Sequence, residues 1–185
     1  MLREETMNII RSLYLSYFSS PPENRALYQA ICRWKPARIV EFGIQRGVRT
    51  ANMLELVRQF HEVEKIEYFC VDPFESRVVE DGPGLSLRKA HKLFVQSGVR
   101  VKPVPGRPED GLRSLTKQIS DVDLLIIATP SPNWIEMQKP ALAELLKPKA
   151  QVFIGTSTLD GSPFELHAYT LQQLMAFLPS CRRAA

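Results

Sequence analysis

The stretch "ARIVEFGIQRGVRTANMLELV", residues 37 to 57, has the outline of a nucleotide-binding turn between a strand and a helix. A short β-branched run ends at Gly43, and a helix is predicted to begin near Thr50. Gly43 lets the backbone turn sharply, and Gly47 lets a ligand or the following helix come close. Gln45 stands where a dinucleotide fingerprint has its middle glycine. The turn therefore fits a ligand without a pyrophosphate, such as one carrying a carboxylate, better than a dinucleotide.

Outside this turn, two helices are predicted before the first strand, and from that strand onward apolar strands alternate with helices. Continuous hydrophobic strands separated by helices predict an α/β fold, a three-layer, doubly wound (Rossmann-like) parallel sheet covered on both faces. Right-handed crossovers give the strand order 3-2-1-4-5, and Pro103 places the third strand at the sheet edge. A single closing helix is predicted for residues 163–178. Strands two to five are predicted at residues 65–74, 99–106, 121–129 and 150–158.

The chain shows no internal linker or repeat. We therefore expect residues 1–185 to form a single domain in which residues 1–36 are an N-terminal helical pair. In doubly wound sheets, ligands bind beyond the carboxyl ends of the central strands, where the strand order reverses. This rule brings "EFGIQRG", "VDPFE" and "ATPSPNW" around one crevice.

These motifs resemble those of the class I S-adenosylmethionine-dependent methyltransferases, in particular the small-molecule, O-methyltransferase-like branch. The first motif of that branch, similar to ExGxxxGxST, stands here as Glu41, Gly43, Gly47 and Thr50. Asp72 ends the second strand, where the family places an acid that binds the ribose hydroxyls. The stretch "VPGRPEDGL", residues 104–112, is similar to the segment that lines the adenine. The resemblance runs from about Arg38 to Ser157.

The resemblance implies a cofactor, a reaction and the residues that hold the cofactor. The cofactor would be S-adenosylmethionine or its product S-adenosylhomocysteine, and a methyl group would pass to a small-molecule acceptor. The turn from Glu41 to Gly47 would meet the methionine end of the cofactor, and Asp72 the ribose. Phe74, together with Arg107 and Pro108, would lie near the adenine.

The chain departs from the family at the end of strand four, which reads "LLIIATPSPNW" and lacks the usual acids. Ala128, Thr129 and Pro130 cannot supply a hard oxygen cage or a general base, so no metal site is expected. No catalytic residue can be named either. His167 has no Cys or His at ligand spacing. Asn133 and Trp134 are candidates only for lining the pocket.

The C-terminal part is shorter than in full class I enzymes, which add an antiparallel hairpin after strand five. Here one closing helix uses up the remaining residues, so strand six and strand seven are not expected. The sheet would then end at strand five and leave an open edge. A homodimer is one way to cover that edge.

A second hypothesis is a catalytically degenerate methyltransferase fold that acts as a binding or interaction module. The uncharged end of strand four and the short C-terminal part motivate it. A cleft filled by Phe74, Gln45 or Arg46 would favour this hypothesis, whereas an open cleft would count against it.

The amino-acid composition limits the classes of partner and the cellular location to be expected. The net charge of +4 comes from scattered basic residues, which argues against nucleic-acid binding, whereas the close group of Arg100, Lys102 and Arg107 argues for it. Nucleic-acid modification is a third hypothesis, which would require the basic residues to form one face. No apolar run is long enough to span a membrane, and the N-terminus lacks the pattern of a signal peptide. The three cysteines suggest no disulfide framework. We expect a soluble, cytoplasmic protein.

Overall fold

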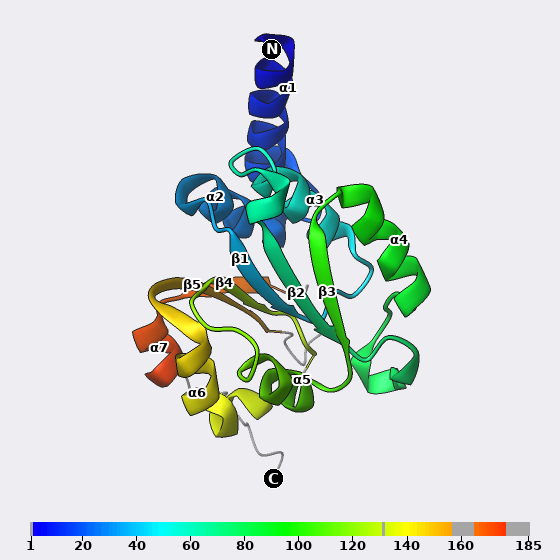
Figure 1. The fold of residues 1–185 in the computed structure, drawn as a ribbon, viewed down its shortest axis with the longest axis vertical. Helices are drawn as coiled ribbons and strands as arrows, with labels where there is room; N and C mark the ends of the chain where they lie inside the picture. The colour runs from blue at the N-terminus through cyan, green and yellow to red at the C-terminus, as the bar shows by residue number, and fades with distance from the viewer. Residues whose placement is uncertain (1, 131, 157–164, 177–185) are drawn as a thin grey trace.

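The computed structural model describes residues 2–130, 132–156 and 165–176, with side chains from residue 7 onward. In this part of the chain, six strands form one sheet in the order β3-β2-β1-β4-β5-β6 (Figure 1). The strands are β1 (Arg38–Phe42), β2 (Glu67–Asp72), β3 (Arg100–Pro105), β4 (Val122–Ile127), β5 (Leu146–Thr156) and β6 (Glu165–Tyr169). The helices are α1 (Leu2–Leu13), α2 (Arg25–Trp34), α3 (Val48–Val57), α4 (Leu87–Ser97), α5 (Pro108–Leu115), α6 (Trp134–Leu145) and α7 (Leu171–Ala176).

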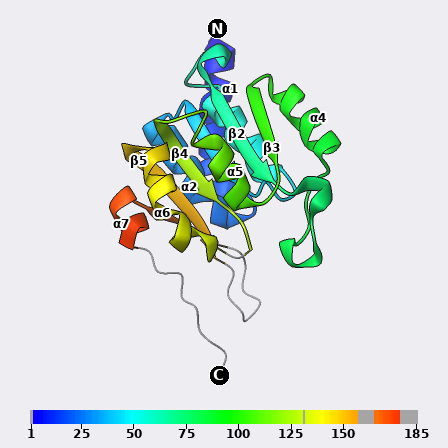
Figure 2. The ribbon, with the colours of Figure 1, turned by 60° about the horizontal axis from the view of Figure 1, so that its bottom comes forward.

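The first five strands run parallel, and each face of the sheet carries its own hydrophobic core. Along β1, Ile39 points to the core shared with α2, α3 and α4, whereas Val40 and Phe42 point to the core shared with α5, α6 and α7. This alternation follows from the period of two in an extended chain. Figure 2 shows α5 and α6 in front of the sheet, with α1 and α2 behind it. The predicted three-layer fold and the order 3-2-1-4-5 are confirmed.

The helix α1 is anchored to the rest of the fold near its C-terminal end. The helix stands away from the layers of the sheet (Figure 1). Arg11 pairs with Glu55 of α3 at 2.8 Å, and the Ser12 hydroxyl donates to Gln59 at 2.6 Å. The chain continues as a π-helix over Tyr14–Phe18 and reaches α2 through a short 3₁₀ turn.

The prediction of one closing helix over residues 163–178 was wrong for residues 165–169, which form β6. This strand pairs antiparallel with β5, from Thr156↔Glu165 to Val152↔Tyr169. The apolar spacing of "ELHAYTLQQL" suits a helix, but the free edge of β5 offers a row of backbone partners that outweighs this periodicity. The helix is limited to α7, and His167 lies on β6 beside Glu165. The sheet therefore does not end at strand five.

Candidate functional site

A cleft of about 510 Å³ opens at the carboxyl ends of β1, β2 and β4. Its walls come from the turn after β1, the end of β2, the loop around residues 77–81, the start of α5 and the connection from β4 into α6. This is the crevice predicted from the strand order, and the three expected segments meet there. The volume lies within the range of pockets that hold small ligands and cofactors.

The turn after β1 depends on Gly43, whose φ of +85° lies in the left-handed region. A Cβ at this position would come within 2.6 Å of the carbonyl oxygen of Ala128, at the end of β4. The Gly43 N–H donates to Val71 O at 2.8 Å, and the Ala128 N–H donates to Phe42 O at 2.7 Å. The absence of a side chain thus lets the ends of β1, β2 and β4 come together beneath the cleft.

Gly47 also has a positive φ, of +77°, but it is not among the residues that line the cleft. A Cβ here would lie 2.7 Å from Cδ1 of Leu93 and 2.8 Å from Cδ1 of Leu85. The second glycine of the motif therefore makes room for two leucine side chains.

Gln45 and Arg46 take different positions at this turn. Gln45 adopts a φ of +51°, and its amide nitrogen donates to Ala128 O at 3.3 Å, so its side chain forms part of the wall. Arg46 is exposed and is not among the residues that line the cleft. Gln45 thus frames the cleft, and neither residue fills it.

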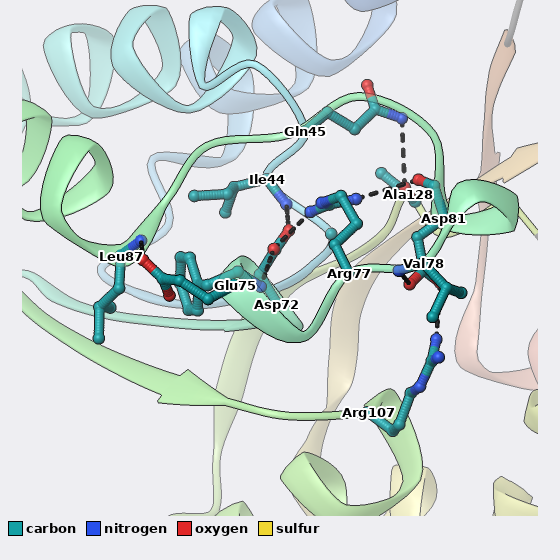
Figure 3. A network of polar contacts seen from close by, with 12 residues as sticks. Ile44, Gln45, Asp72, Glu75, Arg77, Val78, Asp81, Leu87, Arg107 and Ala128 are labelled. Atoms are coloured by element: carbon teal, nitrogen blue, oxygen red, sulfur yellow. Dashed lines mark hydrogen bonds and ion pairs between the residues drawn. The ribbon is translucent and has the colours of Figure 1, made fainter.

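Asp72 is buried at the end of β2 and lines the cleft (Figure 3). Its Oδ2 accepts the N–H of Ile44 at 3.0 Å, and its Oδ1 accepts the N–H of Phe74 at 2.9 Å. The guanidinium of Arg77 also donates to Oδ1 and forms an ion pair with it. One carboxylate therefore ties the turn after β1 to the end of β2 and receives an arginine as well.

Two further predicted site residues lie apart from each other. Phe74 is buried in the core on the α4 side of the sheet and does not line the cleft. Arg107 does line it, at the start of α5, where its guanidinium donates to Asp81 at 2.6 Å. Pro108, the first residue of α5, lies beside it in the wall.

Glu41, the acid of the first motif, turns into the protein beneath the turn. Its carboxylate accepts from Nε and Nη2 of Arg49 at 2.8 and 2.6 Å, from Thr50 Oγ1 at 2.9 Å, and from the Tyr68 hydroxyl. Burial, followed by the nearby Glu41 charge, raises the pKa of Tyr68 well above its ordinary value. The Arg49 guanidinium also donates to Gly43 O at 2.7 Å, so this buried cluster supports the glycine turn from below.

The wall opposite Asp72 is formed where β4 passes into α6. Trp134 begins α6 with its ring centroid 5.1 Å from that of Phe42, and its indole N–H donates to Thr129 Oγ1 at 3.3 Å. Asn133 and the largely exposed Met137 complete this wall. Within residues 7–130, 132–156 and 165–176, no three His, Cys, Asp or Glu side chains gather as a metal site would require.

Sequence reasoning missed Arg77 and Asp81, which belong to the loop after β2 and line the cleft. Both lie just past the Asp72 motif, and the glycines and proline of "SRVVEDGPGLS" marked this segment only as an irregular loop. An opposite charge five residues after a buried acid was the available signal. Spacing in a loop does not predict which charges will meet, because a loop has no fixed periodicity.

Comparisons with known proteins show a shared fold. No protein-family model and no curated protein sequence matches this chain. Among solved structures, the O-methyltransferase TomG from Streptomyces achromogenes, in complex with S-adenosylmethionine, has 21% identity and a TM-score of 0.56 over 74% of this chain and 56% of its own. The S-adenosylhomocysteine-bound Podospora anserina methyltransferase PaMTH1 has 17% identity and a TM-score of 0.54, over 80% and 60%.

A third similar structure is the O-methyltransferase from Bacillus cereus in complex with S-adenosylhomocysteine, with 15% identity and a TM-score of 0.51 over 82% of this chain and 64% of its own. The chain thus spans 56% to 64% of the length of these three proteins. At such identities the likeness establishes the fold alone, a doubly wound Rossmann-like fold that these three proteins share. Among the described helices, none combines the length and the apolar character needed to cross a membrane.

Proposed function

We propose that this cleft binds S-adenosylmethionine or S-adenosylhomocysteine, and that the protein transfers a methyl group to a small-molecule acceptor without a metal. The observation that carries the proposal is the buried Asp72 carboxylate, which lines an open cleft and is joined to the Gly43 turn through the Ile44 N–H. The solved structures of the same fold that contain these two ligands support it.

The residues present fit such a ligand. Asp72 offers carboxylate lone pairs, which suit the two neighbouring hydroxyls of a ribose. Gly43 lines the cleft beside it and lets the ends of β1 and β4 approach each other closely. Arg107 and Pro108 line the cleft beyond the end of β3, where the adenine would lie.

The cofactor, when bound, would supply a reactive sulfonium methyl. What this chain supplies is alignment, because holding a nucleophile in line with the methyl accounts for much of the rate in such a transfer. Thr129, Asn133, Trp134 and Met137 form the wall on which an acceptor would be held. A base from the protein is not required for an acceptor that is already nucleophilic.

Calorimetry with S-adenosylmethionine and S-adenosylhomocysteine tests the proposal. We expect both to bind, and Asp72→Ala to weaken binding by about 1–3 kcal/mol, the cost of leaving ribose hydroxyls without their acceptor. Asp110→Ala, at an exposed position on α5, is the matched control and should bind like the wild type. Absence of heat with both ligands, on folded protein, would refute the proposal. An unchanged affinity of Asp72→Ala would make this acid purely structural.

The second candidate function is a non-catalytic binding or interaction module. Its support is the Arg77–Asp72 ion pair, which already occupies the acid that a ribose would use. The open cleft counts against a filled pocket, and Phe74, Gln45 and Arg46 leave it free. Binding of S-adenosylmethionine without any S-adenosylhomocysteine formed, across acceptors bearing hydroxyl, amine and thiol groups, would favour the module.

Location and partners complete the proposal. Cys32 and Cys70 are free thiols, which fits a reducing compartment such as the cytoplasm. The expected partner is a small molecule, in keeping with a cleft of this size. We retain residues 1–185 as a single domain with an N-terminal helical pair.

A further inference from the structure

The segment Arg77–Leu85, here called the strap, is tied to the walls of the cleft at three points, and Figure 3 shows those at Arg77 and Asp81. The Arg77 guanidinium is bound to Asp72 at the end of β2. The Leu85 N–H donates to Gln45 O in the turn after β1, at 3.0 Å. Asp81 accepts from Arg107 at the start of α5, at 2.6 Å. The strap therefore links the expected contacts of a nucleoside to one another.

The guanidinium of Arg77 packs against the backbone of Gly84, which has no side chain. A Cβ on Gly84 would fall 2.3 to 2.4 Å from Cζ, Nε and Nη2 of Arg77, so the guanidinium lies directly against this glycine. Its Nη1 donates to Asp81 O at 3.0 Å, which fixes the strap to itself. Within the described part of the chain, Arg77 Nε is buried and has no hydrogen-bond partner. The guanidinium is thus held closely but is incompletely satisfied.

The position of Arg77 affects whether a ligand can reach the carboxylate of Asp72. Its side chain is buried, and its oxygens already accept from two backbone N–H groups and from Arg77. The backbone donors belong to the fold, whereas Arg77 comes from a loop. Because the Asp72 side chain is 0% exposed, a ligand hydroxyl reaches the carboxylate only after a neighbour moves, and of these three donors Arg77 is the one supplied by a side chain.

We propose that Arg77 is an internal competitor for the ligand. It occupies the Asp72 oxygen that the sugar hydroxyls need, and the strap must shift before a nucleoside binds. This inference rests on the proposed function. The apparent affinity is then the intrinsic affinity reduced by the fraction of molecules in which Arg77 has left Asp72.

Two substitutions release Arg77 by different routes. Arg77→Met removes the charge and keeps most of the length of the side chain. Gly84→Ala leaves Arg77 and Asp72 unchanged but places a methyl group where the guanidinium now lies. Its backbone φ is not in the left-handed region, so alanine is tolerated there. Arg88→Met, at an exposed arginine of α4, is the control.

The experiment is calorimetric titration of each folded variant with S-adenosylhomocysteine. We expect Arg77→Met and Gly84→Ala to bind about tenfold more tightly than the wild type, and Arg88→Met to bind as the wild type does. Equal or weaker binding by both variants would overturn the competitor while leaving the nucleoside site in place. Absence of binding in every protein would remove the site itself.

Hydrogen exchange supplies a second readout at the strap. The Leu85 N–H, bonded to Gln45 O, should exchange faster in Arg77→Met than in the wild type before any ligand is added. Saturation of the wild type with S-adenosylhomocysteine should also change its protection. Protection that stays the same in both comparisons would contradict movement of the strap.

A separate observation concerns the outer face of α1 and the π-helix that follows it. Arg11 and Ser12 anchor the inner face to α3 and its C-terminal end, while the outer face carries large apolar side chains that are 48% to 69% exposed. Figure 1 shows this helix projecting from the body of the protein. The outer face consists of Met7, Ile9, Ile10, Leu13, Tyr14, Tyr17 and Phe18.

This face is large and apolar, and the paired Arg11 guanidinium lies over one of its rings, 5.7 Å from the centre of Tyr14. Its three aromatic side chains alone leave roughly 300–400 Å² of surface exposed, and the four aliphatic ones add to it. A standard interface covers about 800 Å² per partner, and apolar patches larger than a few hundred Å² mark interaction sites on soluble proteins. Between Met7 and Phe18 the sequence has one charged residue, Arg11, which is paired with Glu55. A helix on an anionic membrane surface would instead carry several lysines or arginines.

We infer that this face binds the same face of a second copy of the chain, because an apolar surface is complementary to itself. The homodimer expected at the edge of β5 does not fit there, since β6 occupies that edge. Light scattering after gel filtration should give a dimer for the wild type and a monomer for Ile10→Lys and Tyr17→Lys.

Val95→Lys, at an apolar side chain of α4 that is exposed to a similar degree, should remain dimeric. A monomeric wild type, or a dimer that persists in both lysine variants, would overturn the inference. Flotation of the wild type with phosphatidylcholine–phosphatidylserine vesicles, lost in Ile10→Lys, would assign the face to a membrane instead.

Discussion

At the scale of single residues, the same motif position can serve a ligand or the core, and geometry decides between them. Glu41 matches the first acid of the methyltransferase motif, yet it lies beneath the turn and accepts from Arg49, Thr50 and Tyr68. Its partners are as buried as it is, with Arg49 only 5% exposed. Its contribution to binding, if the turn meets the cofactor, is therefore made through the backbone that it supports.

Replacing Glu41 by Gln should destabilise the protein strongly. The substitution leaves the Arg49 guanidinium buried without a counter-charge, and breaking a buried pair in this way costs about 3–5 kcal/mol. Urea unfolding followed by circular dichroism measures the effect. Glu62→Gln, in a fully exposed pair with Lys65, is the control and should unfold like the wild type. A loss no larger than that of the control would show that Arg49 finds water in the folded state.

Gly43→Ala should destabilise more than Gly98→Ala, although both glycines have positive φ, of +85° and +69°. The left-handed conformation costs an L-residue about 1–2 kcal/mol in either case. At Gly43 the new methyl group also meets Ala128 O, whereas a Cβ at Gly98 has only Arg58 Cζ nearby, at an ordinary contact distance of 3.9 Å. Unfolding midpoints in urea separate the two contributions. Equal losses would mean that the strand ends can move apart freely.

At the scale of elements, the sequence predicted the parallel strands because their burial leaves a direct pattern. β4, with five of its six residues buried, reads as an almost continuous apolar run. β6 leaves a weaker pattern: in "ELHAY" only Leu166 is fully buried, so helical periodicity and a half-exposed strand cannot be distinguished. What decides between them is the free edge of β5, and that partner lies outside the local sequence.

Some residues of the candidate site could likewise be predicted from the sequence, and others could not. Gly43 and Asp72 could be predicted because strand ends lie at fixed places in a doubly wound sheet, and the structure brings both to one cleft. Phe74 could not be placed, since two residues past the end of β2 the backbone takes a φ of +49° and the ring lies in the core. Arg77 and Gly84 meet through a loop contact that no periodicity encodes.

Asp123 joins three strands at the amino edge of the sheet and should make stability depend on pH. It accepts from the N–H groups of Ala37 and Arg38 and from Lys147. Burial opposes ionisation, but these hydrogen bonds, led by the one from Lys147, lower the pKa of Asp123 below its ordinary value. Its stabilisation is therefore complete above the unfolded-state value, about 3.9, and is lost as the pH falls through the folded-state pKa.

The measurement compares urea midpoints at neutral and strongly acidic pH for the wild type and Asp123→Asn. We expect the variant to be less stable at neutral pH and to lose less on acidification, because it has no carboxylate to protonate. Asp110→Asn, on an exposed side chain, should follow the wild type at both pH values. Parallel pH profiles for wild type and Asp123→Asn would contradict the assignment.

At the scale of the whole molecule, the two tryptophans report on different parts of the fold. Trp134 is 5% exposed and lines the cleft, whereas Trp34 is 52% exposed at the end of α2. Binding of S-adenosylhomocysteine should change the emission of Trp134 and leave that of Trp34 unaltered. Trp34→Phe should keep the full change, and Trp134→Phe should abolish it. A change that survives in Trp134→Phe would place the ligand outside the cleft.

The strand order also determines when the central strand gains its neighbours as the chain is synthesised. Ile39 of β1 pairs with Tyr68 on one side, and on the other with Leu124, which leaves the ribosome much later. Until then, β1, which is an inner strand of the native sheet, has one unpaired edge, and strands of other nascent chains can pair with it. The cleft is also completed late in synthesis, because its last wall extends to Met137. Ligand binding can therefore stabilise the finished fold but cannot assist its first steps.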